Sequence, residues 1–311
     1  MEAIHITLEW IRQQRTYQII FLVLVISLLW PASLFSGLVS QLHSAYLMFS
    51  TSQHDRIQSI WLPDYKLVAP PVIIGEDGDN LSGLTWNQLT STLFMVRNSP
   101  AEVLELTASG HLLRTIKVDA AQDIEAITWT GGDQFVIADE RRQHLALVNI
   151  NETTDRLDLS QMPGFTFNID AGENKGFEGL AWNPRTQSLL VAKERDPMAL
   201  YEIAGLAGKR DERQVLFSSP EHFHRSAKVS NTDYSGLHFD DKTGHLLVLG
   251  DESRRLTEMD DQGKIVSYME LSDGWHGLED SIPQPEGVTM DDDGNLYVIS
   301  EPNLFYRFEK P

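Results

Sequence analysis

Glutamates recur at two fixed places relative to a phrase that is repeated five times. The phrase reads NLSGLTW at 80–86, DIEAITW at 123–129, GFEGLAW at 176–182, DYSGLHF at 233–239 and QPEGVTM at 284–290. Its third position holds Ser82, Glu125, Glu178, Ser235 and Glu286. The second place follows the apolar run after each phrase and holds Asn98, Glu140, Glu194, Glu252 and Glu301. Seven of these ten residues are glutamates, so a fold that gathers them makes a strongly acidic site.

Carboxylates gathered in this way favour cation binding. Like charges held together repel one another and become tolerable when a cation or paired arginines neutralise them. Oxygen ligands without any cysteine or ordered histidine cluster favour Ca²⁺, with Mg²⁺ as the second choice, over zinc. We therefore predict Glu125, Glu178 and Glu286 as metal ligands. Taken singly, each glutamate is better explained by a backbone hydrogen bond at a strand corner or by a salt bridge in a turn.

Arginines beside the second series extend the predicted site. Arg141, Arg195 and Arg254 could instead make it an anion site for carboxylate or phosphate. The predicted ligand-binding residues are Asn98, Glu140, Arg141, Glu194, Arg195, Glu252, Arg254 and Glu301. The sequence contains no G-x-S-x-G elbow, phosphate-binding loop, dinucleotide fingerprint or H-E-x-x-H motif that would identify a reaction.

The phrase is one part of a longer repeat. A turn and a short apolar run follow each phrase, such as STLFMVR at 91–97, and this pattern predicts a β-hairpin. Two further strand-like runs complete each unit, and successive phrases begin 43 to 57 residues apart. Four strands at this spacing are typical of a propeller blade. Trp86, Trp129 and Trp182 share one position of the phrase, and we predict that they pack between blades.

The repeats predict an all-β fold, a five-bladed β-propeller over residues 59–311. The last unit contains only three strands, so we predict that YKLVAPPVIIG at 65–75 supplies the missing strand and closes the ring. A six-bladed propeller is the alternative if 160–175 or 205–232 contains an irregular unit. In a propeller the first strand of each blade lines the channel and the second runs back beside it. Both series of residues should therefore lie at one mouth of the channel.

An uncharged stretch precedes the propeller. Residues 16–42 are long enough to cross a bilayer, with Arg12 and Arg15 before them and no Lys or Arg after them until Arg56. This asymmetry predicts residues 1–15 in the cytoplasm, a transmembrane anchor at 16–42, a stalk at 43–58 and a propeller outside the cytoplasm. A cleaved signal peptide is the alternative, although no convincing cleavage site follows the stretch.

Net charge narrows the class of partner. The chain has 45 acidic and 25 basic residues, which gives a formal net charge of −20. Nucleic acid and anionic membrane surfaces are therefore poor electrostatic partners, whereas cations and basic ligands or proteins fit. The absence of cysteine excludes disulfides, thiolate metal sites and cysteine catalysis.

The chain resembles the SdiA-regulated family over residues 65–310. The resemblance rests on NLSGLTW, GFEGLAW, IADER, LLVLGDESR, the run QPEGVTMDDDGNLYVISEPNLFYRF and the single N-terminal apolar segment. It implies a propeller behind a membrane anchor or signal, here a single-pass inner-membrane protein with its propeller in the periplasm. It implies no reaction.

A more distant resemblance is to the calcium-dependent propellers of the gluconolactonase and arylesterase type, which place a metal-binding Glu in an E-G phrase. Glu178 and Glu286 match that pattern, whereas Glu125 precedes Ala126 and two blades carry serine. Those enzymes complete the site with Asn and Asp from other blades, and Asn98 offers this here. The departures put hydrolysis in doubt even if a metal binds.

Three functions follow from these expectations. The first is a propeller that binds a divalent cation and an unidentified small ligand or protein at its acidic mouth. The second is a calcium-dependent hydrolase of an ester, lactone or phosphoester, with Glu140 or Glu194 as general base. The third is a protein-interaction scaffold that uses its outer loops and whose metal, if any, is structural. Fold analogy alone does not choose among them.

Overall fold

The computed structural model describes residues 42–43, 45–76, 80–167, 176–195, 198–206, 215–219 and 231–311. Contacts between residues divide the chain into Met1–Tyr46 and Leu47–Pro311, and all strands described below belong to the second unit. The predicted transmembrane anchor at 16–42 lies outside the described residues except for its last position. Within the described ranges, no helix is both long and apolar enough to span a membrane.

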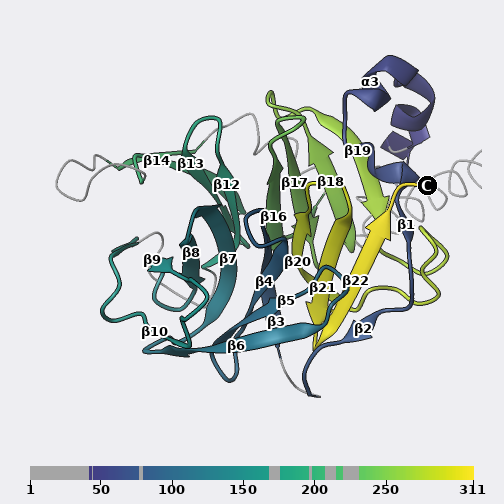
Figure 1. The fold of residues 1–311 in the computed structure, drawn as a ribbon. Helices are drawn as coiled ribbons and strands as arrows, with labels where there is room; N and C mark the ends of the chain where they lie inside the picture. Colours follow the sequence, from purple (N-terminus) through teal and green to yellow (C-terminus); the bar gives the residue numbers. More distant parts are fainter. Residues whose placement is uncertain are drawn as a thin grey trace, which may run out of the picture. The chain divides into compact units, whose positions relative to one another are not determined.

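The described part of Leu47–Pro311 forms five sheets, and each contains one copy of the repeated phrase (Figure 1). Blade 1 consists of β3 (Leu81–Asn87), β4 (Thr92–Arg97), β5 (Glu102–Leu106) and β6 (Leu112–Asp119). Blade 2 consists of β7 (Ile124–Gly131), β8 (Gln134–Asp139), β9 (His144–Asn149) and β11 (Gly164–Thr166). Blade 3 consists of β12 (Phe177–Asn183), β13 (Ser188–Lys193), β14 (Ala199–Ala204) and β15 (Leu216–Ser218). Blade 4 consists of β16 (Gly236–Asp240), β17 (His245–Gly250), β18 (Arg255–Met259) and β19 (Ile265–Glu270).

Blade 5 joins the two ends of the unit and closes the ring. Its own strands are β20 (Gln284–Met290), β21 (Leu296–Glu301) and β22 (Leu304–Glu309). β1 (Lys66–Leu67) and β2 (Val72–Ile73) both pair antiparallel with β22. The prediction that 65–75 completes the last blade is confirmed. Pro70 and Pro71 lie between the two short strands, because a residue without an N–H cannot continue the ladder.

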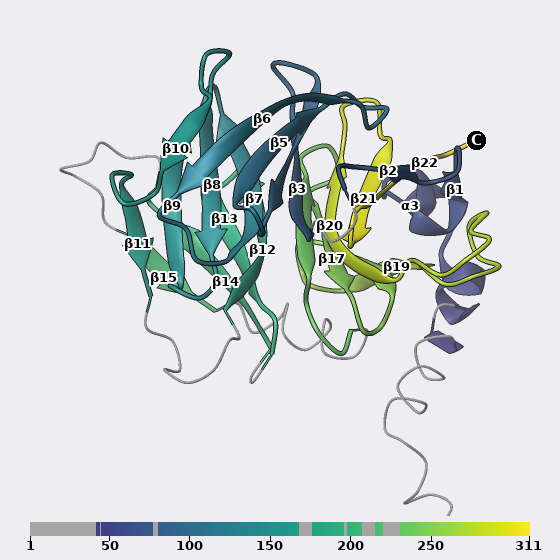
Figure 2. The ribbon, with the colours of Figure 1, turned by 90° about the horizontal axis from the view of Figure 1, so that it is seen from below.

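The first strands of the blades form an inner ring. β3 contacts β7, β7 contacts β12, β12 contacts β16, β16 contacts β20, and β20 contacts β3. Figures 1 and 2 show the sheets arranged around this ring. The described residues therefore form the predicted five-bladed propeller.

The insert after β9 adds strands to existing blades. β10 (Arg156–Asp158) pairs in parallel with β6 of blade 1, and the chain then returns so that β11 pairs with β9 of blade 2. The described part of 160–175 thus supplies the fourth strand of blade 2, where the alternative prediction had allowed an irregular sixth blade.

Glycine in the repeated phrase permits close contact between neighbouring inner strands. Gly83 has a φ of +50°, and a Cβ atom there would lie 2.6 Å from the Cα atom of Ala126 in blade 2. Apolar side chains fill the space between adjacent blades; Phe94 of blade 1 and Phe135 of blade 2, for example, have ring centroids 4.8 Å apart. These contacts fix the inner strands relative to one another.

A segment before β1, which we call the strap (residues 59–65), packs on blades 4 and 5. Its Ile60, Leu62 and Tyr65 are buried in one apolar cluster with residues of both blades. The N–H groups of Ile60 and Trp61 donate hydrogen bonds of 2.8 and 3.0 Å to the carboxylate of Glu258, which is fully buried. Upstream of the strap lies the short helix α3 (Gln53–Ile57), whose first turn is capped by the Ser52 side chain.

Candidate functional site: an acidic mouth of the channel

β-Bulges place the predicted metal ligands. Glu125, Glu178 and Glu286 are each the residue that the pairing skips in an inner strand. Ile124 pairs with Asp139 and Ala126 with Ala138, so Glu125 opposes no residue of its own. A bulge bends the strand locally and redirects the side chain of the extra residue. In three blades the residue at the third position of the phrase therefore has no partner residue on the neighbouring strand.

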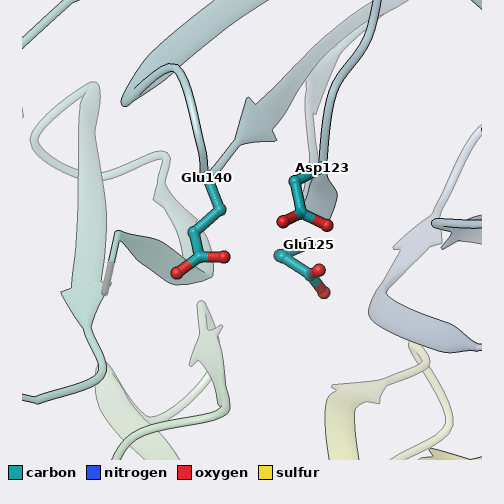
Figure 3. A group of neighbouring side chains, drawn as sticks. All are labelled: Asp123, Glu125 and Glu140. Carbon is teal, nitrogen blue, oxygen red and sulfur yellow. The ribbon is translucent and has the colours of Figure 1, made fainter. Parts of the chain in front are cut away.

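Three carboxylates converge between blades 1 and 2. One ligand atom from each of Asp123, Glu125 and Glu140 lies within 4.8 Å of the others. Figure 3 shows the three side chains gathered together. Asp123 precedes β7, Glu125 lies on its bulge, and Glu140 follows β8. The amide nitrogen of Asn98, at the exit of β4, donates to Glu125 at 2.9 Å and also to Asp123. We call Asp123, Glu125 and Glu140 the triad.

Neighbouring groups hold the triad in place. Arg141 pairs with Asp123 at 3.0 Å, although its own side chain is more than half exposed. The N–H of Gly176 donates a 2.7 Å hydrogen bond to Glu140, which ties the triad to blade 3. Ser82 lies beside Glu125, close enough to lower the pKa of that carboxyl group. Its buried hydroxyl nevertheless has no described residue placed with the distance and angle of a hydrogen bond. That hydroxyl is a polar group still able to bind something placed at the triad.

Burial and mutual repulsion make the carboxylates of the inner ring weak acids. Burial raises the pKa of Glu125 to about 8, and the charges of Asp123 and Glu140 add to the rise, whereas Ser82 opposes it. The pKa of Glu286 is raised to about 10, again by burial first. Burial and the nearby glutamates raise the pKa of Glu178 well above its usual range. Each acid repels at least one of the others, which shows that the side chains from blades 2, 3 and 5 converge on one mouth.

The outer part of the mouth is an ion-pair network between blades 3 and 4. Arg195 contacts Glu194 and also Glu252, the latter at 2.8 Å. Asp233 accepts the backbone N–H groups of Asp251 and Glu252, both at 3.0 Å. Here arginine and backbone donors already bind the carboxylates. These acidic residues therefore have the salt bridges and backbone hydrogen bonds that we expected for a glutamate without a metal.

The predicted site residues fall into groups. Glu125, Glu140, Asn98 and Arg141 belong to the triad region, and Glu178 and Glu286 lie within electrostatic reach of it. Glu194, Arg195 and Glu252 form the network at the outer edge, and the charge of Glu301 raises the pKa of Glu286. Arg254 donates at 3.4 Å to the carbonyl oxygen of Pro283. Of the two serines, Ser235 donates to the carbonyl oxygen of Pro285, which leaves it bound within the protein.

Sequence reasoning missed Asp123. It stands before β7, and Glu125 lies on the bulge, so simple strand alternation does not place the two side chains together; the only signal in the sequence is a second acid in the same phrase. Asp233 occupies the same position of its own phrase, but its carboxylate is used by backbone donors. The position alone therefore does not identify a ligand.

Comparison with known proteins places the chain in a family. The family model described as SdiA-regulated matches residues 57–309. The chain belongs to the SdiA-regulated family. This confirms the resemblance read from the sequence, and the match covers the whole propeller together with the strap.

Solved structures are similar to the chain at low identity. A luciferin-regenerating enzyme is 15% identical with a TM-score of 0.49, covering 78% of this chain and 94% of that chain. A gluconolactonase from Xanthomonas campestris is 12% identical with a TM-score of 0.45, covering 79% and 97%. A chain of a nidogen and laminin complex is 16% identical with a TM-score of 0.46, covering 72% and 73%. At these identities and TM-scores the likeness assigns no activity to the chain.

Proposed function

We propose that this SdiA-regulated propeller binds a divalent cation at Asp123, Glu125 and Glu140, and that the cation helps to hold a small ligand or a protein partner. The observation that carries the proposal is the convergence of three largely buried carboxylates within 4.8 Å. Such a group is costly unless protons or a cation neutralise it. All the donors are oxygen atoms, which favours Ca²⁺ first and Mg²⁺ second.

Two further features support a bound cation. The buried Ser82 hydroxyl beside Glu125 has no complete hydrogen bond among the described residues, so a hydrated ion would give it a partner. Asn98 already joins Asp123 to Glu125, which keeps the two carboxylates together despite their repulsion. The residues present therefore fit an oxygen-ligated metal.

The ligand would approach through the outer network. The side chains of Arg141, after β8 of blade 2, and of Arg195, after β13 of blade 3, are 56% and 38% exposed. Together with Asn98, Glu194, Glu252, Arg254 and Glu301 they form the surface that we propose for the ligand.

We also propose a cellular location. Residues 16–42 anchor the protein in the inner membrane, and the propeller lies in the periplasm.

The test is metal-dependent stability of the full chain. The protein is stripped with EDTA and titrated with Ca²⁺, Mg²⁺ and Zn²⁺ while thermal unfolding is followed. A ligand at a hundredfold excess over its Kd stabilises by about 2.7 kcal/mol, which raises the Tm of a domain of this size by roughly 5–10 °C. We expect the shift with Ca²⁺, its loss in Glu125→Gln and Asp123→Asn, and its retention in Glu279→Gln, an exposed control.

The alternatives predict other results. A calcium-dependent hydrolase would turn over an ester, lactone or phosphoester only with metal present, and Glu194→Gln would abolish turnover while leaving the metal-induced shift. A scaffold, whose metal would be structural if it had one, predicts that partner binding is lost on changes to the outer loops rather than on changes at the mouth. The absence of a shift with any of the three ions would refute the proposed cation site.

A further inference from the structure

A cavity lies at the other end of the inner strands, away from the triad. Its volume is about 370 Å³, and all five inner strands line it. The sixth position of the phrase contributes Thr85, Thr128, Ala181, His238 and Thr289. The seventh position contributes Trp86, Trp129, Trp182, Phe239 and Met290. Ser82 and Trp86 are four residues apart, about 13 Å along a strand, so this cavity is separate from the triad.

Blades 1 to 3 supply an aromatic side. The indole N–H of Trp86 donates to Asp292 at 3.1 Å, and that of Trp129 donates to the carbonyl oxygen of Gly132 at 2.8 Å. These donors are used within the protein, so neither N–H is available to a ligand, and the half-buried rings of Trp129 and Trp182 supply the π surface. Trp129 and Trp182 are half-buried, whereas Trp86 is buried between blades as predicted. Trp129 and Trp182 nevertheless pack against the apolar clusters between blades 1 and 2 and between blades 2 and 3, so the prediction of inter-blade packing is confirmed for all three.

Blades 4 and 5 supply an acidic side. Asp240, Asp291 and Asp292 line the cavity, and the donors to their carboxylates that the structure shows are neutral groups such as N–H, hydroxyl and indole. Both oxygens of Asp291 already accept hydrogen bonds within its turn. These carboxylates thus contribute negative charge more than free hydrogen-bonding capacity.

The positive charge near the cavity is small. Arg185 pairs with a fourth carboxylate, Asp241, at 3.3 Å. Lys242 also lines the cavity, where its ammonium group donates to the carbonyl oxygen of Asp292. Burial lowers the pKa of His238 to about 4, so its imidazole is neutral at pH 7. The carboxylates therefore exceed the cationic groups, in a chain whose formal net charge is −20.

We propose that this aromatic and acidic cavity binds a quaternary ammonium ion. A cation over an indole face gains from the ring quadrupole, and the neighbouring carboxylates add long-range attraction. A quaternary ammonium requires no hydrogen bonds, which suits carboxylates that are already engaged. A metal ion fits less well, because among the described residues the clustering of ligand oxygens seen at the triad is not repeated at these aspartates.

Choline is the probe, and 3,3-dimethylbutan-1-ol is its neutral counterpart of the same shape. Both are titrated into the folded full chain, and binding is followed by calorimetry and tryptophan fluorescence. We expect choline to bind at least tenfold more tightly than the alcohol. Equal affinity for the two, or tighter binding of a neutral sugar such as glucose, would overturn the proposal.

Variants locate the binding. We expect Trp129→Leu and Asp292→Asn to weaken choline binding at least fivefold. Trp275→Leu, at an indole that is 52% exposed and away from the cavity lining, and Asp261→Asn, at an exposed aspartate, are matched controls that should leave it unchanged. Trp129→Phe keeps an aromatic ring and should retain most of the affinity, which separates the role of the ring from a loss of folding.

The two mouths must also be told apart, because an acidic triad attracts cations too. Glu125→Gln should leave choline binding unchanged, and saturating Ca²⁺ should not displace choline. Loss of choline binding in Glu125→Gln would assign the cation to the triad and refute the second site. The inference does not depend on the proposed metal, since it uses none of the triad residues.

Discussion

Calcium affinity at the triad should depend steeply on pH, because the cation must displace a proton. Burial places the pKa of Glu125 at about 8, so near pH 6 only about one molecule in a hundred carries this carboxylate ionised. Near pH 8 about half do. A cation that requires the ionised form therefore binds about fiftyfold more weakly at pH 6 than at pH 8, through this group alone.

Isothermal titration calorimetry at pH 6, 7 and 8 measures both quantities that matter. The apparent Kd for Ca²⁺ should fall as the pH rises, and titrations in buffers of different ionisation enthalpy should show close to one proton released per ion at pH 6. Glu125→Gln should weaken binding and flatten the pH dependence, whereas Glu279→Gln should behave like the parent protein. A Kd that changes less than threefold from pH 6 to 8, with no proton release, would refute the reasoning.

Three further outcomes follow from the structure. Replacing the buried Glu258 by Ala leaves two strap N–H groups without an acceptor. We expect the free energy of unfolding, measured with denaturant, to fall by about 3–5 kcal/mol. A fall of less than about 1 kcal/mol would show that Glu258 does not hold the strap. Gly83→Ala should destabilise by several kcal/mol more than Gly294→Ala, because both glycines have positive φ but only Gly83 would place a Cβ against a neighbouring backbone. Without metal, the raised pKa of Glu125 means that the folded state binds more protons than the unfolded chain between pH 4.5 and 8. Thermal stability should therefore fall as the pH rises through that window, and saturating Ca²⁺ should reverse the fall. A rise in stability without metal would contradict the raised pKa of Glu125.

The repeat made the fold predictable because it combines two independent constraints. Each phrase is followed by a turn and an apolar run that predict a hairpin, and successive phrases begin at the spacing of a propeller blade, so five copies require five blades. The incomplete last unit then required a strand from elsewhere, and 65–75 pairs with β22 as expected. What the repeat does not specify is the outer edge, where β10 joins blade 1 in place of its own blade.

The site was harder to predict, because side-chain partners decide it. The two series of residues do gather at one mouth, but the outer glutamates of blades 3 and 4 are paired with Arg195, while those near blade 2 are not so neutralised. Glu125 also depends on a bulge, and a bulge shifts register without any obvious mark in the letters of the phrase. Spacing alone could not show which carboxylates would remain available to a cation.

Blade 2 differs from the other blades in a way that explains the position of the triad. It is the blade whose phrase has an acid at both the first and third positions and whose second strand is also followed by a glutamate. Blade 4 repeats the first acid as Asp233, but it carries Ser235 in place of the bulged glutamate, and Asp233 is bound by backbone donors. Blade 1 contributes Asn98, an uncharged group that joins two carboxylates without adding to their repulsion. A fivefold scaffold thus bears an asymmetric site, because the chemistry depends on which blade carries acids at all three positions and on whether its neighbour supplies a neutral donor.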